Sequence, residues 1–268
     1  MPVNQRAKGF QKGVDVRRKI FGAEMEKAAS VSPSAQMFPE MWQLSNEVMF
    51  GRVWGRSREL SLKNRSLIVV TTQIALGKTD ELRSHLLGAL HLGWTKEQVL
   101  EVILHMAYYA GWPAAVGALR ASKTVFDEKG LTQPVKPYVK GKRKRAADVL
   151  YQRGIAMRER LSGVPSSGNK STIEEVHPDM WRLTMEVVFG QVWPRRRLPV
   201  QSCCLVTVSC LVTLGRWDEL RIHMRNALNV GWTKQQVREV ILQCAFYAGW
   251  PAARHSLTVA KEVFAQVL

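Results

Sequence analysis

The chain has 268 residues, of which 46% are hydrophobic and 23% are charged, and its formal net charge is +17. No apolar run approaches the roughly 20 residues of a membrane-spanning helix, and the basic N-terminus lacks the apolar core of a secretion signal, so we expect a cytoplasmic protein without a membrane segment. The positive charge favours anionic ligands, but no nucleic-acid-binding module is recognisable; we therefore expect a small carboxylate or an acidic partner rather than nucleic acid.

One unit is present twice along the chain. Residues 80–115 and 218–253 are identical at about two-thirds of their positions. The match continues upstream in PEMWQLSNEVMFGRVW and PDMWRLTMEVVFGQVW, where the offset differs by one residue, and more weakly around Gly22 and Gly154. Internal repeats of this kind indicate duplicated structural units. We place the two units at 8–132 and 146–268, joined by a basic Pro/Lys/Arg linker at 133–145.

Helix signals follow one another within each unit. Ser61 is suited to cap a helix through the apolar run at 67–70, which ends at Gly77. The β-branched residues of this run make a strand the competing interpretation, but the length and the terminal glycine favour a helix. Residues 95–98 form a capping box, and residues 233–236 repeat it. Because no strand alternation or hairpin signal is present, the sequence predicts an all-α protein with about six helices per unit.

All four cysteines lie in the second unit, and no two of them are spaced as CxxC. They are Cys203, Cys204, Cys210 and Cys244. This distribution argues against a disulfide framework and against a zinc site. We expect buried thiols and no bound metal.

The first unit contains FGRVW and LKNRSLI, followed by DELRSH, GWT and YAGWPAA. In these motifs the chain closely resembles the carboxymuconolactone decarboxylase family. The resemblance covers nearly the whole chain, twice over. It implies two tandem AhpD-like helical units, the fold shared with alkylhydroperoxidase-type proteins. It also implies a homo-oligomer, in which three two-unit chains would imitate a ring of six units. A small carboxylated lactone as substrate and a reaction without a cofactor follow from the same resemblance.

Each unit carries a glutamate four residues before a histidine, namely Glu81 with His85 and Glu219 with His223. Residues four apart share one helix face, so the carboxylate can hold one ring nitrogen and leave the other nitrogen to move a proton. An ordinary surface ion pair would give the same spacing. The family's reaction loses CO2 and leaves an enolate that must be protonated. We therefore predict that these four residues are catalytic.

The peroxidase branch of this fold uses a CxxC motif whose second cysteine lies four residues before a histidine. The corresponding positions of this chain are Lys78, Glu81, Arg216 and Glu219. A thiol–disulfide cycle needs two thiols, so the sequence excludes that chemistry at these positions.

Further residues are candidates for substrate binding. Lys63 and Arg65 belong to the LKNRSLI segment and are predicted to bind the substrate carboxylate, whereas Gln201 and Cys203 replace them in the second unit. This difference predicts a second site that is altered or silent. Four aromatic residues either line a pocket or pack in the core: Trp54, Tyr109, Trp193 and Tyr247.

We interpret the chain as a cofactor-independent decarboxylase that acts on a small carboxylated lactone or a related cyclic acid. An isomerase or cyclase of specialised metabolism would use the same groups. A non-catalytic oligomeric scaffold that binds an acidic partner is the alternative from another class. His105 becomes Gln243 in the second unit, so we expect no role for it.

Overall fold

The computed structural model describes residues 3–136, 147–165 and 172–266. Within these ranges the secondary structure is helical and contains no strand, which confirms the predicted fold class. None of the helices in these ranges is both long and apolar enough to cross a membrane. Most of the predicted linker, residues 137–145, lies outside the described residues.

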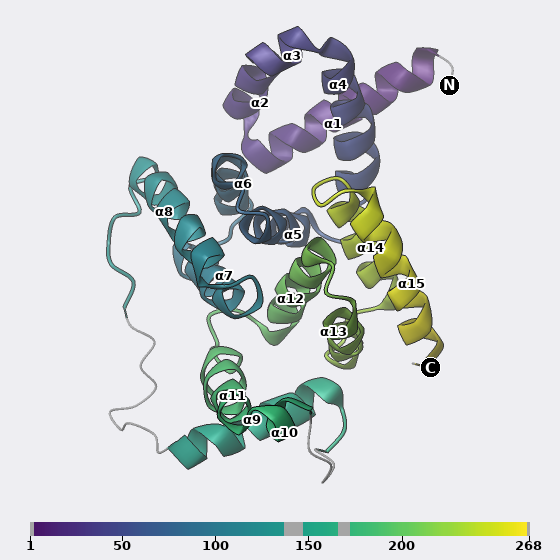
Figure 1. Cartoon of the computed structure of the whole chain (residues 1–268). Helices are drawn as coiled ribbons and strands as arrows, with labels where there is room; N and C mark the ends of the chain where they lie inside the picture. The colour runs from purple at the N-terminus through teal and green to yellow at the C-terminus, as the bar shows by residue number, and fades with distance from the viewer. Residues whose placement is uncertain (1–2, 137–146, 166–171, 267–268) are drawn as a thin grey trace.

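Among the described residues, all helices of the first unit except α2 have a counterpart in the second unit (Figure 1). The helices of the first unit are α1 (Val3–Phe21), α2 (Ala23–Ser30), α3 (Pro33–Met37), α4 (Pro39–Leu44), η1 (Ser45–Trp54), α5 (Leu62–Ala75), α6 (Thr79–His91), α7 (Lys96–Tyr109) and α8 (Trp112–Glu128). The helices of the second unit are α9 (Ala147–Ser162), α10 (Thr172–Val176), α11 (Pro178–Leu183), η2 (Thr184–Val192), α12 (Val200–Leu214), α13 (Trp217–Asn229), α14 (Lys234–Ala245) and α15 (Trp250–Gln266). The π-helices η1 and η2 continue α4 and α11 without a break, so each described unit has about six principal helices, as the sequence predicted.

Helices α5 and α12 lie against each other at the centre of the molecule, although they belong to different units (Figure 1). Every residue at 65–74 and at 203–213 is buried. The hydroxyl oxygens of Thr72 and Thr213 lie 3.3 Å apart across this contact. A segment that is apolar on all sides is stable as a helix only when it is surrounded, and here each unit surrounds the central helix of the other. This burial explains why the β-branched run is a helix and not a strand.

The predicted helix starts are also present. Ser61 Oγ accepts a hydrogen bond of 3.2 Å from the backbone N–H of Asn64 at the start of α5. Complete capping boxes begin α7 at Thr95 and α14 at Thr233. Each box satisfies backbone donors that the first turn of a helix leaves unpaired.

Glycines allow α1 to cross η1 and α9 to cross η2 at close range. A Cβ atom on Gly13 would lie 1.9 Å from the carbonyl oxygen of Asn46, and one on Gly154 would lie 2.0 Å from that of Met185. Asn46 and Met185 occupy equivalent positions in the repeat. The counterpart of Gly154 is therefore Gly13, and the match of Gly154 with Gly22 that the sequence suggested is wrong.

The corrected register pairs Gly22 with Gly163. Both glycines end their helices with a positive φ, 86° and 74°, a conformation that side chains with a Cβ rarely adopt. Arg17 and Arg158 now also match, since both units read Gly-x3-Arg-x4-Gly over this stretch.

We predict that Gly154→Ala destabilises the protein by about 1–3 kcal/mol or more, because the added methyl group forces α9 away from η2. The free energy of unfolding in urea measures this loss. Gly117→Ala in α8 is the matched control: its Cβ would meet Thr79 Cγ2 at an ordinary 3.7 Å, so stability should change by less than about 1 kcal/mol. Equal effects of the two substitutions would contradict the close crossing.

Candidate active sites

The first candidate site is built from both units. His85, on α6, packs its ring against Tyr247 of the second unit, with centroids 5.4 Å apart and planes at 82°. Trp54 Nε1 donates a hydrogen bond of 3.0 Å to the hydroxyl oxygen of Tyr247. The ring of Phe21 lies 5.7 Å from that of His85 and covers another side. The structure thus brings together three predicted site residues from different units.

The second site repeats this arrangement with the units exchanged. His223, on α13, faces Tyr109 of the first unit at 5.4 Å, and its ring stacks on Trp193 at 6.2 Å. Trp193 Nε1 donates a hydrogen bond of 2.9 Å to the Tyr109 hydroxyl oxygen. Each histidine therefore meets the tyrosine of the other unit, which a repeat alignment cannot reveal.

The π-helices η1 and η2 present the tryptophans. A π-helix closes i→i+5 hydrogen bonds, as the 2.9 Å bond from Gly55 N to Phe50 O shows. Trp54 is the last residue of η1, and Trp193 directly follows η2. Each stacks on a phenylalanine of its π-helix, with Phe50 6.0 Å from Trp54 and Phe189 6.1 Å from Trp193. Single π-helical turns are frequent at functional sites, and here the same irregularity occurs in both units.

Arg17, on α1, is a cation at the first site that our sequence analysis missed. Its guanidinium carbon lies 4.4 Å from the ring of Trp42 and 4.6 Å from that of Phe50. The residue is 9% exposed, and its Nε has no hydrogen-bond partner among the described residues. Its charge acts on both His85 and Tyr247. A buried cation with an unsatisfied donor can bind an anion. The Gly-x3-Arg-x4-Gly match was the signal that could have found it.

The site histidines are neutral at pH 7. Burial lowers the pKa of His85 to about 4, and the charge of Arg17 acts in the same direction. Burial also lowers the pKa of His223 to about 4. The phenol of Tyr247 stays protonated, because burial raises its pKa above the usual range despite the hydrogen bond from Trp54 and the charge of Arg17.

The surroundings of the two tyrosine hydroxyls differ. Among the described residues, the Tyr247 hydroxyl accepts from Trp54 but has no acceptor for its own proton. Burial raises the pKa of Tyr109, and hydrogen bonds to its hydroxyl from Trp193 and Thr207 act in the opposite direction. The second site therefore has a threonine hydroxyl next to its tyrosine, where the first unit has Val69.

His105 belongs to the second site, which the sequence analysis did not expect. Its Nε2 lies 2.8 Å from Thr207 Oγ1, and its ring stacks on Tyr109 at 4.9 Å. In the first site the equivalent Gln243 accepts a hydrogen bond of 3.0 Å from Arg65 Nη1. The buried polar residue beside the tyrosine therefore differs between the two sites, and His105 contacts residues of the second site.

The predicted carboxylate–histidine contacts are not formed. Glu81 and Glu219 are exposed, and neither makes a hydrogen bond or an ion pair within the described part of the chain. The pKa values of His85 and His223 are governed by burial, with no contribution from these carboxylates. Residues four apart do share a helix face, but the histidine turns inward under the aromatic rings while the glutamate remains in solvent.

Lys63 and Arg65 have protein partners that the sequence did not predict. Lys63 Nζ donates a hydrogen bond of 2.8 Å to the carbonyl of Gly93. Arg65 is 0% exposed and pairs with Glu239 of the second unit at 2.6 Å, and Arg56 pairs with the same carboxylate at 2.6 Å. Burial would raise the pKa of Glu239, but the hydrogen bonds from the two arginines hold it below its usual range. These contacts give Arg65 a role in joining the units.

Among the described residues, neither site contains a cluster of metal ligands or a reactive thiol. Within the described ranges, no three His, Cys, Asp or Glu side chains come close enough to hold a metal ion. All four cysteines are buried, and burial raises the pKa of Cys204, Cys210 and Cys244 to about 12. A thiol with so high a pKa is a poor nucleophile at neutral pH.

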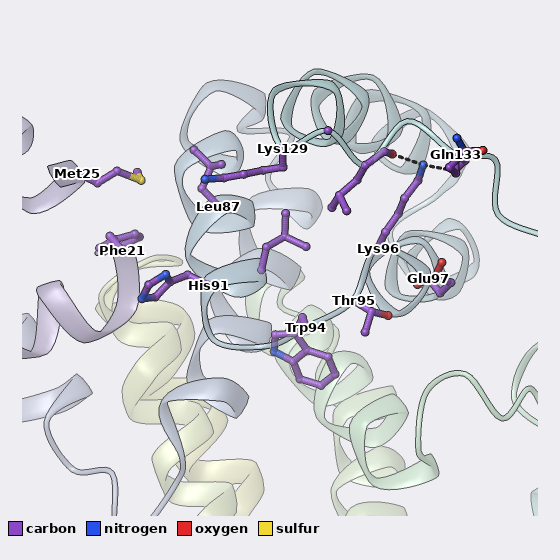
Figure 2. A pocket seen from close by; sticks show the side chains of 13 residues that line it. Phe21, Met25, Leu87, His91, Trp94, Thr95, Lys96, Glu97, Lys129 and Gln133 are labelled. Carbon is purple, nitrogen blue, oxygen red and sulfur yellow. Dashed lines mark hydrogen bonds between the residues drawn. The ribbon is translucent and has the colours of Figure 1, made fainter. Parts of the chain in front are cut away.

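Two clefts adjoin the sites. The cleft beside the first site has a volume of about 600 Å³ and shares Phe21 with it. Figure 2 shows Phe21 and Met25 on one side of this cleft, Trp94 on another, and Lys96 donating hydrogen bonds to the carbonyl oxygens of Leu131 and Gln133. The cleft beside the second site has a volume of about 570 Å³ and shares Trp193 with it.

The profile of the carboxymuconolactone decarboxylase family matches residues 39–124 and 178–262, one segment in each unit. The chain belongs to this family. It is 37% identical to a 4-carboxymuconolactone decarboxylase of Acinetobacter baylyi over 116 residues, which are 42% of this chain and 86% of that protein. It is 29% identical to the nitrosuccinic acid decarboxylase npaB of Metarhizium robertsii over 115 residues, 42% of this chain and 80% of the relative.

Among solved structures, the chain resembles a candidate gamma-carboxymuconolactone decarboxylase subunit from Burkholderia xenovorans. The TM-score is 0.57 at 18% identity, over 96% of this chain and 98% of that one, so the similarity concerns the fold. The two profile matches confirm that this member of the carboxymuconolactone decarboxylase family is a tandem protein, as the sequence predicted.

We predict that Glu239→Gln costs about 3–5 kcal/mol of stability at pH 7, because it leaves the buried guanidinium of Arg65 without its counter-charge. Unfolding in urea, followed by circular dichroism, measures the change. Glu40→Gln, at an exposed position, should change stability by less than about 0.5 kcal/mol. A small loss in Glu239→Gln would show that the ion pair between the units is not important for stability.

We also predict that the protein loses stability as the pH falls from about 6.5 to about 4. Burial, and then the charge of His223, lowers the pKa of His105 to about 3, whereas an unfolded histidine titrates near 6.5. Between these values the unfolded chain binds more protons, so the free energy of unfolding falls with falling pH. His105→Gln, which installs the residue used at position 243, should make this slope shallower in urea unfolding from pH 7 to pH 4.5. His91→Asn, an exposed control that installs the residue at position 229, should keep the full slope.

Proposed function

We propose that the chain is a cofactor-independent decarboxylase of a small carboxylated lactone or related cyclic acid, and that the site at His85 carries the reaction. The observation that supports this most is the pairing of a buried Arg17, whose Nε has no hydrogen-bond partner among the described residues, with a Tyr247 hydroxyl whose proton has no acceptor there. The family and the names of two relatives support decarboxylation.

Each group has a distinct task in this proposal. When CO2 leaves, the C–C bond to the carboxylate breaks and its electron pair moves to the neighbouring carbonyl oxygen, which becomes an enolate. Arg17 and the O–H of Tyr247 stabilise this developing negative charge. The neutral ring of His85 transfers to carbon a proton that it draws from water. The aromatic rings of Phe21 and Phe50 exclude water from the departing carboxylate, which favours its loss as neutral CO2.

The glutamates have a smaller part in this proposal than the sequence suggested. Glu81 lies on the same helix as His85, but its exposed side chain has no contact with that ring in the structure. We propose that the histidine works without a carboxylate partner in the unliganded protein. An isomerase would share the enolate and its stabilisation, so the products distinguish the two reactions.

We propose that the second site has a different specificity or a lower activity. Arg158 stands in the place of Arg17, 5.0 Å from Trp181, but is more exposed. Ser162 replaces Phe21, and Thr207, which replaces Val69, makes a further hydrogen bond to the Tyr109 hydroxyl. A more exposed cation stabilises an enolate less well, because water weakens its field.

We further propose that the chains assemble into a homo-oligomer through their outer helices. Trp112 at the start of α8 and its counterpart Trp250 at the start of α15 are 59% and 63% exposed. Leu119 and Leu257, at equivalent positions on the same helices, are 47% and 51% exposed. Matching apolar surface on both units suits contacts between copies, since monomers rarely expose such patches.

The test compares matched variants of the two sites in an assay of CO2 release from 4-carboxymuconolactone and from nitrosuccinic acid, with product analysis by NMR. His85→Gln and Tyr247→Phe should each lower kcat/KM by about 100-fold or more, the size of a lost acid–base group. Arg17→Gln should lower it by at least about 10-fold. The counterparts His223→Gln, Tyr109→Phe and Arg158→Gln should each cost less than about threefold.

Three results would contradict the proposal. Full activity of His85→Gln and Tyr247→Phe would remove the first site from the reaction. A loss in Glu81→Gln as large as that in His85→Gln would show that the carboxylate works with the histidine once substrate binds. An isomer of the lactone acid, formed without CO2, would make the enzyme an isomerase.

A further inference from the structure

The cleft beside the first site is lined by apolar side chains where it meets that site. Its volume is about 600 Å³. Leu87 and Leu90 line it from α6, shortly after His85 on the same helix, and Phe21 and Met25 line it from α1 and α2. A cleft of this size and lining suits a small organic ligand or a large substituent of one.

The ring of Phe21 forms the boundary between this cleft and His85. It lies 5.7 Å from the histidine ring and is also part of the lining of the cleft. The ring packs closely on α6, since a Cβ atom on Gly88 would lie 2.9 Å from Phe21 Cε1. A larger residue at position 88 would therefore displace the ring. A ligand held at His85 has the cleft directly beyond this one side chain.

The second unit does not repeat this apolar boundary. Three of its residues are replaced by polar ones: Phe21 by Ser162, Gly88 by Asn226 and Leu87 by Arg225. Arg225 donates a hydrogen bond to the side chain of Gln266. The apolar surface next to the histidine is thus a feature of the first unit.

The end of the first helix of each unit is also held differently. In the second unit, Asn229 Nδ2 donates hydrogen bonds of 3.1 Å and 2.6 Å to the carbonyl oxygens of Leu161 and Ser162, which join α13 to the end of α9. In the first unit, His91 stands at the equivalent position and lines the cleft (Figure 2). Within the described residues it makes no such hydrogen bond to α1. The second unit therefore bridges with hydrogen bonds a place that the first unit leaves to the cleft.

The polar groups of the cleft lie away from the site. Figure 2 shows Phe21 and Met25 at one end of the cleft and Lys96 with Gln133 at the other. The ammonium group of Lys96 donates hydrogen bonds of 2.6 Å and 2.8 Å to the carbonyl oxygens of Leu131 and Gln133. The end of the cleft next to His85 thus offers apolar contact and not charge.

We propose that the first site acts on acids that carry an apolar substituent, and that this substituent binds in the cleft beyond Phe21. The inference rests on the proposed function of the site at His85 and names the substrate class of that site. An alkyl or aryl group against Leu87 and Met25 leaves water for an apolar surface, which stabilises the complex in proportion to the area buried. Arg225, at the position of Leu87, makes the second unit unsuited to such a group.

The experiment compares two unreactive acids, methylsuccinate and hexylsuccinate, by isothermal titration calorimetry on the full chain. Both lack the carbonyl or nitro group that accepts the electron pair of a departing carboxylate, so they bind without reacting. The hexyl chain adds apolar surface and no charge. Hexylsuccinate should bind the wild type at least about tenfold more tightly than methylsuccinate.

Substitutions in the lining of the cleft locate this gain. Leu87→Arg installs the residue that α13 carries at position 225, and it should bring the two affinities to within about threefold of each other. Met25→Ser, a second variant at a half-buried position, should lower the gain by at least about threefold. The control Ile222→Arg adds the same charge on α13 at a residue that is 55% exposed and does not line the cleft, and it should keep the full gain.

Three outcomes would overturn the inference. These are equal affinities of the two acids for the wild type, an equal loss in Leu87→Arg and Ile222→Arg, or a full gain in cleft variants that fold normally by circular dichroism. His85→Gln should keep the gain while it loses turnover. A chain that releases CO2 from lactone acids but shows no gain would refute this inference alone, and a chain that shows the gain without such activity would refute the proposed function alone.

Discussion

The hydrogen bond from each site tryptophan to the tyrosine of the other unit is the contact on which both candidate sites depend. Trp54 reaches Tyr247, and Trp193 reaches Tyr109. These bonds require η1 to lie beside α14 and η2 beside α7, which in turn requires α5 and α12 to cross at the centre. Neither unit alone supplies all residues of a candidate site or buries its own central helix, so both candidate sites need the two units together.

Exchange of the tyrosines also explains how the two sites could diverge within one chain. Because each site takes residues from both units, a substitution in one unit changes the surroundings of both sites. His105 differs from Gln243, and Arg65 differs from Cys203, so the first site has an arginine–glutamine contact where the second has a histidine on Thr207. The buried ion pairs of Glu101 and Glu239 are kept in both units, since they join the units whatever the sites become.

The sequence was sufficient for most of the architecture. The repeat, the capping boxes and the glycine-ended helices predicted an all-α tandem protein, because these signals are local and each is encoded within a few residues. The sequence also identified His85, His223, Trp54, Trp193, Tyr109 and Tyr247 as candidates. It missed Arg17 because the weak N-terminal match was aligned on the wrong glycine, and it discounted His105 because the residue differs between the units.

Local spacing could not decide which side chains meet. Glu81 and His85 have the spacing of an interacting pair. In the folded protein, however, the histidine packs against aromatic rings while the carboxylate stays exposed to solvent. Arg65 matches a family pattern, but in the folded protein it forms an ion pair with Glu239 of the other unit. The sequence by itself determined the helices, their ends and the duplication, which depend on near neighbours in the chain. The tertiary structure decided the partner of each site residue, because burial and contacts between distant segments, not spacing, determine where a charged or aromatic side chain is stable.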